Sequence, residues 1–464
     1  MSNDYKDSLN SIENSNQNLG KSFNAQVSVP EESNNELLNQ EKIEKLIPEF
    51  LKNPNLVIKE LSSAISQIKN IDYNYYKSTG IHDFIINYIL HEEDDSLFYD
   101  AYTIFYLTTN RKQFSSNTPY LGDFIEKTIQ YIKNHENNAD FPLASLCVIA
   151  ASSQDFIETF LGSGFFEFVF SIVSTENAPI KLVAIAAYLI RHCITYVPIQ
   201  DASKIFDLGI FILKLRVSDQ IELKVFSGFC DSLDCIDLMH HLLENNFLDE
   251  IISLLELYDK IITYGCLSFI EILASFNFPE DVDPYFPHPI QFILETTLIS
   301  HLIQLIFNED QNIYETVITI LHRFIVFNGE CLDLILNDDS VNKICEIMEE
   351  SSFDSQRMAV FFICEIIACT HNLKFWEYII NKGGIEGILR ILESNDDKMT
   401  REIITALEHG ITILPETVFT LMENGAIEIL EQLAQDEDCS HPDACMALVK
   451  RIKVEAKRLA KRNR

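Results

Sequence analysis

Apolar and polar positions along the chain follow a phrase that returns at a nearly constant distance. GGIEGILRIL begins at Gly383, and GAIEILEQL begins at Gly425, 42 residues later. After the glycine, apolar residues stand at i, i+1, i+3 and i+4, which places them on one face of a helix. Glycine suits the left-handed backbone conformation of a turn between two helices. The phrase therefore predicts a tight turn followed by a short amphipathic helix.

The same apolar pattern can be aligned along most of the sequence, at intervals of 40 to 51 residues. The aligned copies begin at Ile81, Leu121, Phe166, Leu208, Leu248, Ile299, Val341, Ile385 and Ile427. The longest interval contains FPEDVDPYFPHP (278–289), whose four prolines predict an inserted loop. A partial copy at 43–70 precedes them, which makes about ten units.

Each unit contains three segments of helical length. In the clearest copy these are FWEYII (375–380), GILRIL (387–392) and TREIITALEHGI (400–411), separated by polar or glycine-containing breaks. Three helices in about 42 residues are typical of armadillo and HEAT repeats. We therefore predict an all-α, right-handed superhelical solenoid of about ten units, with the third helices lining its inner face. Such units are stable only as a stack, because each buries its apolar face against its neighbours.

The two ends of the chain differ from the repeats. Residues 1–39 contain nine Asn, seven Ser, six acidic residues and two Lys without apolar periodicity, which predicts a disordered acidic and polar tail. We place the solenoid at 40–452 and a basic C-terminal tail at 453–464. The segment 450–464 holds eight basic residues and one acidic residue. Its two basic clusters resemble a bipartite localisation signal, and a helix cap with a solvated basic face is an equal alternative.

Charge narrows the choice of partners. The chain has 70 acidic and 35 basic residues, a formal net charge of −35. This balance disfavours nonspecific nucleic-acid binding and favours basic protein partners, although acidic residues that only solvate helix faces are a simpler alternative for most of them. The polar opening MSNDYKDSLN predicts no signal peptide, and no apolar run has the length of a membrane helix. We expect a cytoplasmic or nuclear protein that binds neither nucleic acid nor membrane.

Motifs of catalysis or metal binding are weak. LGKSF (19–23) lacks the first glycine of a phosphate-binding loop, since residue 15 is Ser15. CSHPDAC (439–445) brings two Cys and one His together but offers no fourth zinc ligand nearby. The 11 cysteines form no C-x-x-C pair, which favours reduced thiols in the core. We therefore predict no enzymatic activity, no cofactor and no metal.

Two C-terminal segments carry a resemblance to a known family. NKGGIEGILRILESNDDKMTREIITALEHGI (381–411) and ENGAIEILEQLAQDEDCSHPDACMALVKRI (423–452) resemble the last units of importin alpha, the adaptor that carries nuclear localisation signals. The order ELLNQEKIEKLI, LKNPN and STGIHDFIINYIL near the start is similar to that family's first units. The resemblance implies a concave groove that binds extended basic peptides, and coupling to importin beta for nuclear protein import.

The resemblance also implies which residues line the groove. In the family, a Trp and an Asn one turn later project from each third helix, and the i, i+4 spacing puts both on one face. No unit here keeps a Trp–Asn pair, and residues 1–39 contain only Lys6 and Lys21 as basic residues. Trp376, the sole tryptophan, falls on a first helix, where we expect it in the core. The groove residues carried over are Tyr102, Tyr106, Tyr188, His192, Glu271, Phe361, Glu365 and His409.

Two functions therefore remain open from the sequence. One is an importin-alpha-like adaptor that binds basic segments of cargo proteins. The other is an armadillo-repeat scaffold with no transport role, for which any protein partner would suffice.

Overall fold

The structure is a computed structural model. It describes residues 34–68, 71–109, 120–152, 154–175, 177–276, 287–327, 338–369 and 372–462. Over these ranges the regular structure is helical, without a β-strand. The chain divides into two compact parts, an N-terminal part that ends at Leu242 and a C-terminal part that begins at Leu243.

Ten second helices and ten third helices alternate along the described residues, and six units also show the predicted first helix. First helices are short: α5 (Tyr73–Ser78), α10 (Gln154–Gly162), α15 (Ile236–Glu244), α18 (Pro289–Leu294), α24 (Leu373–Asn381) and α27 (Thr417–Glu423). Second helices are α3 (Asn34–Phe50), α6 (Ile81–His91), α8 (Leu121–Asn134), α11 (Phe165–Val173), α13 (Ala202–Leu215), α16 (Phe247–Leu255), α19 (Leu298–Leu305), α22 (Asp338–Glu350), α25 (Gly384–Leu392) and α28 (Ala426–Leu433).

The third helices end each unit and are the longest in most units. They are α4 (Pro54–Ile65), α7 (Phe98–Thr108), α9 (Asp140–Ala150), α12 (Ile180–Cys193), α14 (Asp219–Ser232), α17 (Lys260–Ala274), α20 (Gln311–Phe327), α23 (Phe353–Cys369), α26 (Asp397–Ile413) and α29 (Pro442–Arg462). Short 3-10 turns lie at Asp95–Leu97, Glu136–Asn138, Ile194–Tyr196 and Ile199–Asp201.

Most predicted boundaries agree with these helices to within a few residues, with three differences. Leu208 lies inside α13, which begins at Ala202, so that copy of the phrase starts earlier than the alignment placed it. Helix α3 begins at Asn34, inside the segment assigned to the N-terminal tail, and residues 1–33 lie outside the described residues. Helix α29 continues to Arg462, so residues 453–462 form the end of the last helix.

The turns explain why the phrase returns. The residue before the second helix has a positive φ in six units, and it is glycine in four: Gly80, Gly164, Gly383 and Gly425, with Tyr120 and Asn246 at the equivalent place. A second left-handed residue follows the second helix at Asn177, Arg216, Tyr258 and Asn395. Since this conformation is costly for most residues, it fixes the direction of the chain on one side of the second helix, and in the units of α11, α16 and α25 on both sides.

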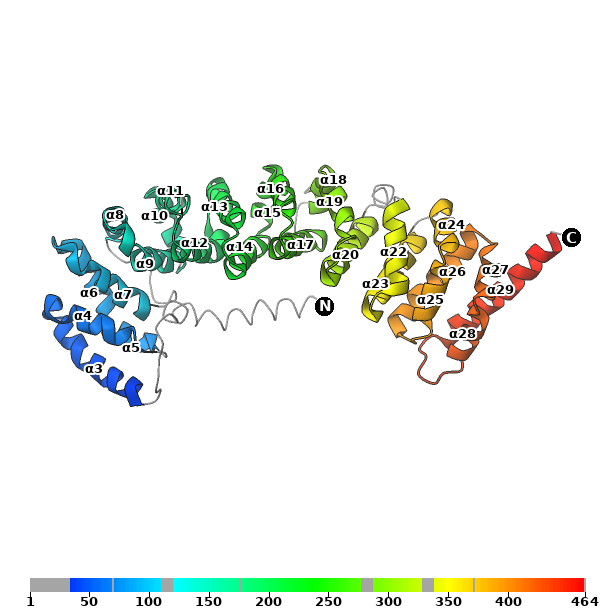
Figure 1. The fold of residues 1–464 in the computed structure, drawn as a ribbon, viewed down its shortest axis with the longest axis horizontal. Coiled ribbons are helices and arrows are strands. Elements are labelled where there is room, and N and C mark those ends of the chain that lie inside the picture. Colours follow the sequence, from blue (N-terminus) through cyan, green and yellow to red (C-terminus); the bar gives the residue numbers. More distant parts are fainter. Residues whose placement is uncertain are drawn as a thin grey trace. The chain divides into compact units, whose positions relative to one another are not determined.

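Within each part the helices stack in layers. In the N-terminal part, α7, α9, α12 and α14 pack in sequence against one another, while α6, α8, α11 and α13 do the same on the other side (Figure 1). In the C-terminal part, α17, α20, α23, α26 and α29 form the corresponding layer of third helices. Apolar side chains fill the space between layers, as with the stacked rings of Phe206 and Phe229, 5.0 Å apart. A third helix inside a layer, such as α9, therefore has nine of its eleven residues buried.

The sole tryptophan belongs to the core, as predicted. Trp376 on α24 is 0% exposed, and its indole Nε1 donates a hydrogen bond of 3.0 Å to Thr417 Oγ1. Gly410 on α26 packs against the ring, since an added Cβ would lie 2.5 Å from Trp376 Cζ2. The absence of a side chain at position 410 is therefore required by the volume of the indole.

This contact gives a test of the packing. Gly410→Ala should lower the free energy of unfolding by about 1–2 kcal/mol, because overpacking against a buried ring outweighs the roughly 1 kcal/mol gain in helix propensity. Trp376 is the only tryptophan, so its fluorescence during urea unfolding reports this unit directly. Gly122→Ala is the matched control, since an added Cβ there meets nothing within 4 Å and should not destabilise. A neutral or stabilising Gly410→Ala would contradict the packing described.

Candidate protein-binding surface

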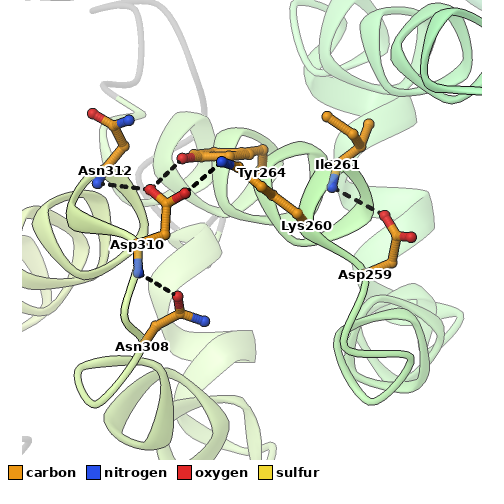
Figure 2. Close-up of polar contacts among 7 residues, drawn as sticks. All are labelled: Asp259, Lys260, Ile261, Tyr264, Asn308, Asp310 and Asn312. Atoms are coloured by element: carbon orange, nitrogen blue, oxygen red, sulfur yellow. Dashed lines mark hydrogen bonds and ion pairs between the residues drawn. The ribbon is translucent and has the colours of Figure 1, made fainter.

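The exposed stripes of the third helices are held side by side by polar contacts at their N-terminal ends. Asp310, which caps α20, shows the arrangement most fully (Figure 2). Its carboxylate accepts hydrogen bonds from the Tyr264 hydroxyl at 2.6 Å and from the backbone N–H of Asn312 at 3.0 Å. Lys260 Nζ lies 2.6 Å away as well. One side chain therefore caps its own helix and fixes the preceding third helix, α17.

The electrostatics agree with this geometry. The hydrogen bonds from Lys260 and Tyr264 hold the pKa of Asp310 below its usual value, because they stabilise the ionised carboxylate. The stability that Asp310 contributes is therefore present above the ordinary pKa of an aspartate and is lost as the pH falls through the lowered value. Two further hydrogen bonds order the connecting loops, from Asp310 N to Asn308 Oδ1 and from Ile261 N to Asp259 Oδ1 (Figure 2).

Related contacts join other third helices, each between residues about one unit apart. In the N-terminal part the Tyr99 hydroxyl donates to Asp140 at 3.3 Å, and Lys181 lies 3.7 Å from the same carboxylate. In the C-terminal part the pairs are Gln311 with Ser352 at 2.7 Å and Arg357 with Asp396 at 3.1 Å. Several acidic residues of the third helices are thus used to align the layer.

An aromatic patch occupies the stripes of α7, α9 and α12. We call it the N-terminal patch and define it as Tyr99, Tyr106, Phe141, Tyr188 and His192, all partly exposed. The Phe141 ring lies 5.5 Å from that of Tyr99 and 5.8 Å from that of Tyr106, and the rings of Tyr188 and His192 are 4.4 Å apart. Burial raises the pKa of Tyr106, and the neighbouring Tyr188 adds to this. Of the predicted residues, Tyr188 and His192 are thus in contact with each other, and Tyr106 contacts Phe141.

Tyr102 is a correction to the predicted groove. Its side chain is 0% exposed, and its hydroxyl donates a 2.8 Å hydrogen bond to Thr128 Oγ1 on α8. The exposed stripe of α7 runs from Tyr99 to Tyr106, seven residues or almost two full turns apart, whereas Tyr102 is rotated toward the second-helix layer. It therefore belongs to the core and cannot contact a partner.

Two predicted residues on α23, Phe361 and Glu365, lie beside a histidine of α20 that the sequence did not single out. We call this group the C-terminal patch and define it as His322, Phe361 and Glu365, all partly exposed. His322 Nε2 lies 3.6 Å from Glu365 Oε2, and its ring lies 5.1 Å from that of Phe361. The patch therefore combines an aromatic ring with a carboxylate and an imidazole that can carry a positive charge.

The remaining two predicted residues lie on the third helices to either side of the C-terminal patch, α17 and α26. Glu271 on α17 is partly buried, which raises its pKa, while Arg323 on α20 acts in the opposite direction. His409 on α26 is partly exposed. Both positions remain predictions as partner contacts.

Sequence reasoning missed Tyr99, Phe141 and Tyr264. In the second unit the positions carried over from the Trp–Asn array were Ala144 and Val148, which are 4% and 7% exposed. The exposed aromatics instead lie in the first turns of their helices. Their repeat is visible in the sequence, since Tyr99 and Phe141 stand 42 residues apart, close to the interval of the phrase itself.

The described residues contain neither a cluster of side chains suited to a metal ion nor a single helix suited to cross a membrane. In these ranges no group of three or more His, Cys, Asp or Glu side chains could hold a metal ion, including the segment 439–445. Over the same ranges no single helix is long and apolar enough to cross a membrane. One pair of helices bent by 66°, Phe156–Gly162 and Phe165–Val173, passes that test by length and composition only.

The fold and the repeated third-helix contacts define an all-α solenoid of armadillo-like three-helix units. Among solved structures, an engineered protein determined by a structural genomics consortium is similar with a TM-score of 0.57 and 15% sequence identity. The match covers 89% of this chain and 98% of that protein. At this identity the likeness concerns the fold alone.

Two other solved structures are similar over shorter or looser alignments. A designed armadillo repeat protein in complex with the peptide (KR)4 matches with 14% identity and a TM-score of 0.32, over 62% of this chain and 99% of that one. A structure concerning the interaction between cadherin and beta-catenin matches with 13% identity and a TM-score of 0.48, over 79% of this chain and 67% of that one. No protein-family model and no curated protein matches the chain.

The alignment of third helices can be tested at Asp310. Asp310→Ala should weaken the first turn of α20 by about 1–2 kcal/mol, because a cap and the bond from Tyr264 are both lost. Hydrogen exchange should then accelerate at Asn312 and the following amides of α20. Glu309→Gln is the charge-matched control, because Glu309 is exposed and adjacent. Equal exchange rates in Asp310→Ala and the wild type would show that the contact in Figure 2 does not hold the two helices.

Proposed function

We propose that this chain is a non-enzymatic protein-binding solenoid whose third helices bind extended segments rich in Lys and Arg. The observation that carries the proposal is the grouping of partly exposed aromatic rings with ionisable side chains on adjacent third helices. Tyr106, Tyr188 and His192 contribute in the N-terminal part, and Phe361 and Glu365 in the C-terminal part. Within each patch the side chains come from successive third helices, so an extended chain could contact several of them in succession.

The chemistry of the patches suits basic side chains. A Lys or Arg stem packs on the face of an aromatic ring, and its charge is attracted by the ring quadrupole. Carboxylates nearby, such as Glu365 and Glu271, can receive the charged end. The net charge of −35 adds a long-range attraction for positively charged partners. Binding would therefore depend on both ring contact and ionic strength.

For the biological role we propose an importin-alpha-like adaptor in nuclear protein import, acting in the cytoplasm and the nucleus and coupled to importin beta or another transport factor. The support is the resemblance of segments 381–411 and 423–452 to that family, together with the third-helix position of the patches. The fold alone does not define this role, which the two binding tests below examine.

A scaffold without a transport role is the second candidate, and a specific observation favours it. In importin alpha the groove is built on repeated tryptophans, whereas the one tryptophan here, Trp376, is 0% exposed on a first helix. A groove with tyrosines, phenylalanine and histidines in place of tryptophan could serve partners of other composition.

The first test measures peptide binding by the whole chain. A fluorescent peptide of alternating Lys and Arg should bind, and Tyr188→Ala should weaken the binding about fivefold or more, because a central aromatic anchor contributes over 1 kcal/mol. Phe307→Ala is the control, since Phe307 is 48% exposed and lies outside both patches. Affinity should also fall steeply as ionic strength rises from about 0.1 M to about 1 M, over which the screening length shortens from roughly 10 to 3 Å. Binding that ignores both Tyr188 and salt would eliminate the proposed surface.

The second test separates the two roles. If the chain is a transport adaptor, affinity capture from cell extract should recover importin beta, and adding the Lys/Arg peptide in excess should displace basic cargo from the captured complex. Tyr188→Ala should lose cargo and keep importin beta. Capture of other partners through the same patches without any transport factor would favour the scaffold.

A further inference from the structure

The N-terminal part contains one feature that the binding of basic segments does not use. Arg191 on α12 and Lys224 on α14 lie on the two helices that pack side by side in Figure 1. Arg191 Nη1 donates a hydrogen bond to Ser227 Oγ. Lys224 stands three residues before Ser227 on the same face of α14, so both cationic groups flank one serine.

The two helices are in very close contact at this point. A Cβ added to Gly228 would lie 2.9 Å from the Arg191 Cα, so the backbones of α12 and α14 approach each other directly. The Cα atoms of the two cationic residues are therefore held by packed helices and not by loops. Such rigid support is what a binding site for a small charged group requires.

The pairing of like charges is unusual in this chain. Acidic residues outnumber basic ones two to one, yet among the described residues neither Arg191 nor Lys224 forms an ion pair with a carboxylate. Both side chains are partly exposed. Burial lowers the pKa of Lys224, and the charge of Arg191 lowers it further, as expected for two cationic groups on adjacent helices.

Carboxylates lie on α14 on both sides of Lys224. Asp219 and Glu222 precede it, and Glu222 is buried. Asp231 is seven residues beyond Lys224, which corresponds to about 10 Å along a helix. Arg191 lies near this end of α14, since its charge opposes the rise that burial and Asp231 cause in the pKa of Cys230.

Arg191 is also connected to the N-terminal patch. It stands three residues after Tyr188 and one residue before His192 on α12. A segment that crosses the ring of Tyr188 would therefore reach the guanidinium within one helical turn. Ser227 occupies one guanidinium nitrogen, while the other donors and the three of Lys224 can face an incoming group.

We propose that Arg191 and Lys224, with Ser227 holding the guanidinium, form a site for an oxyanion carried by the bound protein segment. The oxyanion is a phosphate monoester or a carboxylate side chain, the two groups that a guanidinium and an ammonium bind by charge-assisted hydrogen bonds. This site rests on the proposed function for its ligand, since the same segment contacts the N-terminal patch. It makes the partner a basic segment with one acidic or phosphorylated position.

The first arm of the test uses inorganic phosphate with the full chain. Phosphate should raise the thermal unfolding midpoint of the wild type more than chloride at equal ionic strength. The double variant Arg191→Gln/Lys224→Gln should lose that difference, and its own fold should persist because a repulsive contact is removed. Lys214→Gln is the control for charge, as Lys214 is exposed on α13 in the second-helix layer. An equal phosphate effect in the double variant and the wild type would overturn the site, because it reflects an adventitious ion only.

The second arm uses three fluorescent Lys/Arg peptides that differ at one central position: serine, phosphoserine or glutamate. Phosphoserine should bind the wild type about tenfold more tightly than serine, a change typical of a charge-assisted contact, and should gain nothing in the double variant. Glutamate binding as tightly as phosphoserine assigns the site to carboxylates, and glutamate binding like serine assigns it to phosphate. A phosphoserine gain that survives in the double variant, or no gain in a wild type that does bind the serine peptide, overturns the proposal.

The two proposals fail in different ways. If none of the peptides binds but inorganic phosphate still stabilises the wild type and not the double variant, the oxyanion site stands and the proposed function is wrong. If all three peptides bind the wild type and the double variant with equal affinity, the proposed function stands and the oxyanion site is wrong.

Discussion

The packing of successive third helices against one another within each part is the constraint on which the rest of the structure depends. Helices such as α9 and α23 contact the preceding and the following third helix as well as their own second helix. Little of their surface is left, so almost every residue of α9 is buried. A partner can therefore be recognised only along one line of positions per unit. This explains why the candidate surface consists of one or two side chains from each helix.

The fold could be predicted from the sequence because its turns require particular backbone conformations. Gly383 and Gly425 mark the start of a second helix, and their φ values of 80° and 75° confirm the reason. Tyr120 and Asn246 occupy the same conformation without glycine, so only the apolar residues after them identified those units. The register failed at Leu208, because α13 begins at Ala202 and already buries Ile205 and Phe206 before that position.

The site was harder to predict because a small rotation of a third helix about its axis decides whether a side chain lies in the core or at the surface. Tyr102 and Tyr106 are one turn apart and both aromatic, yet the first is buried against Thr128 and the second is partly exposed. Neither periodicity nor residue type separates them. The separation depends on where α8 lies relative to α7, and that is a property of the packed unit. Tyr188 and His192 on α12 are both partly exposed, and their role as partner contacts stays a prediction.

The acidic charge also has a different distribution from what composition suggests. Asp140, Asp310 and Asp396 lie at the N-terminal ends of third helices. There they accept hydrogen bonds from the neighbouring third helix or form ion pairs with it. These carboxylates favour the helix N-terminus for electrostatic reasons as well. They are therefore not available to a partner, and the net charge overstates the acidity of the binding surface. Local pairs of charges, such as His322 with Glu365 or Arg191 beside Lys224, are the groups that the two proposals assign to contacts with a bound segment. In those proposals, long-range attraction brings basic segments to the protein, and the local pairs set the order of charges along them.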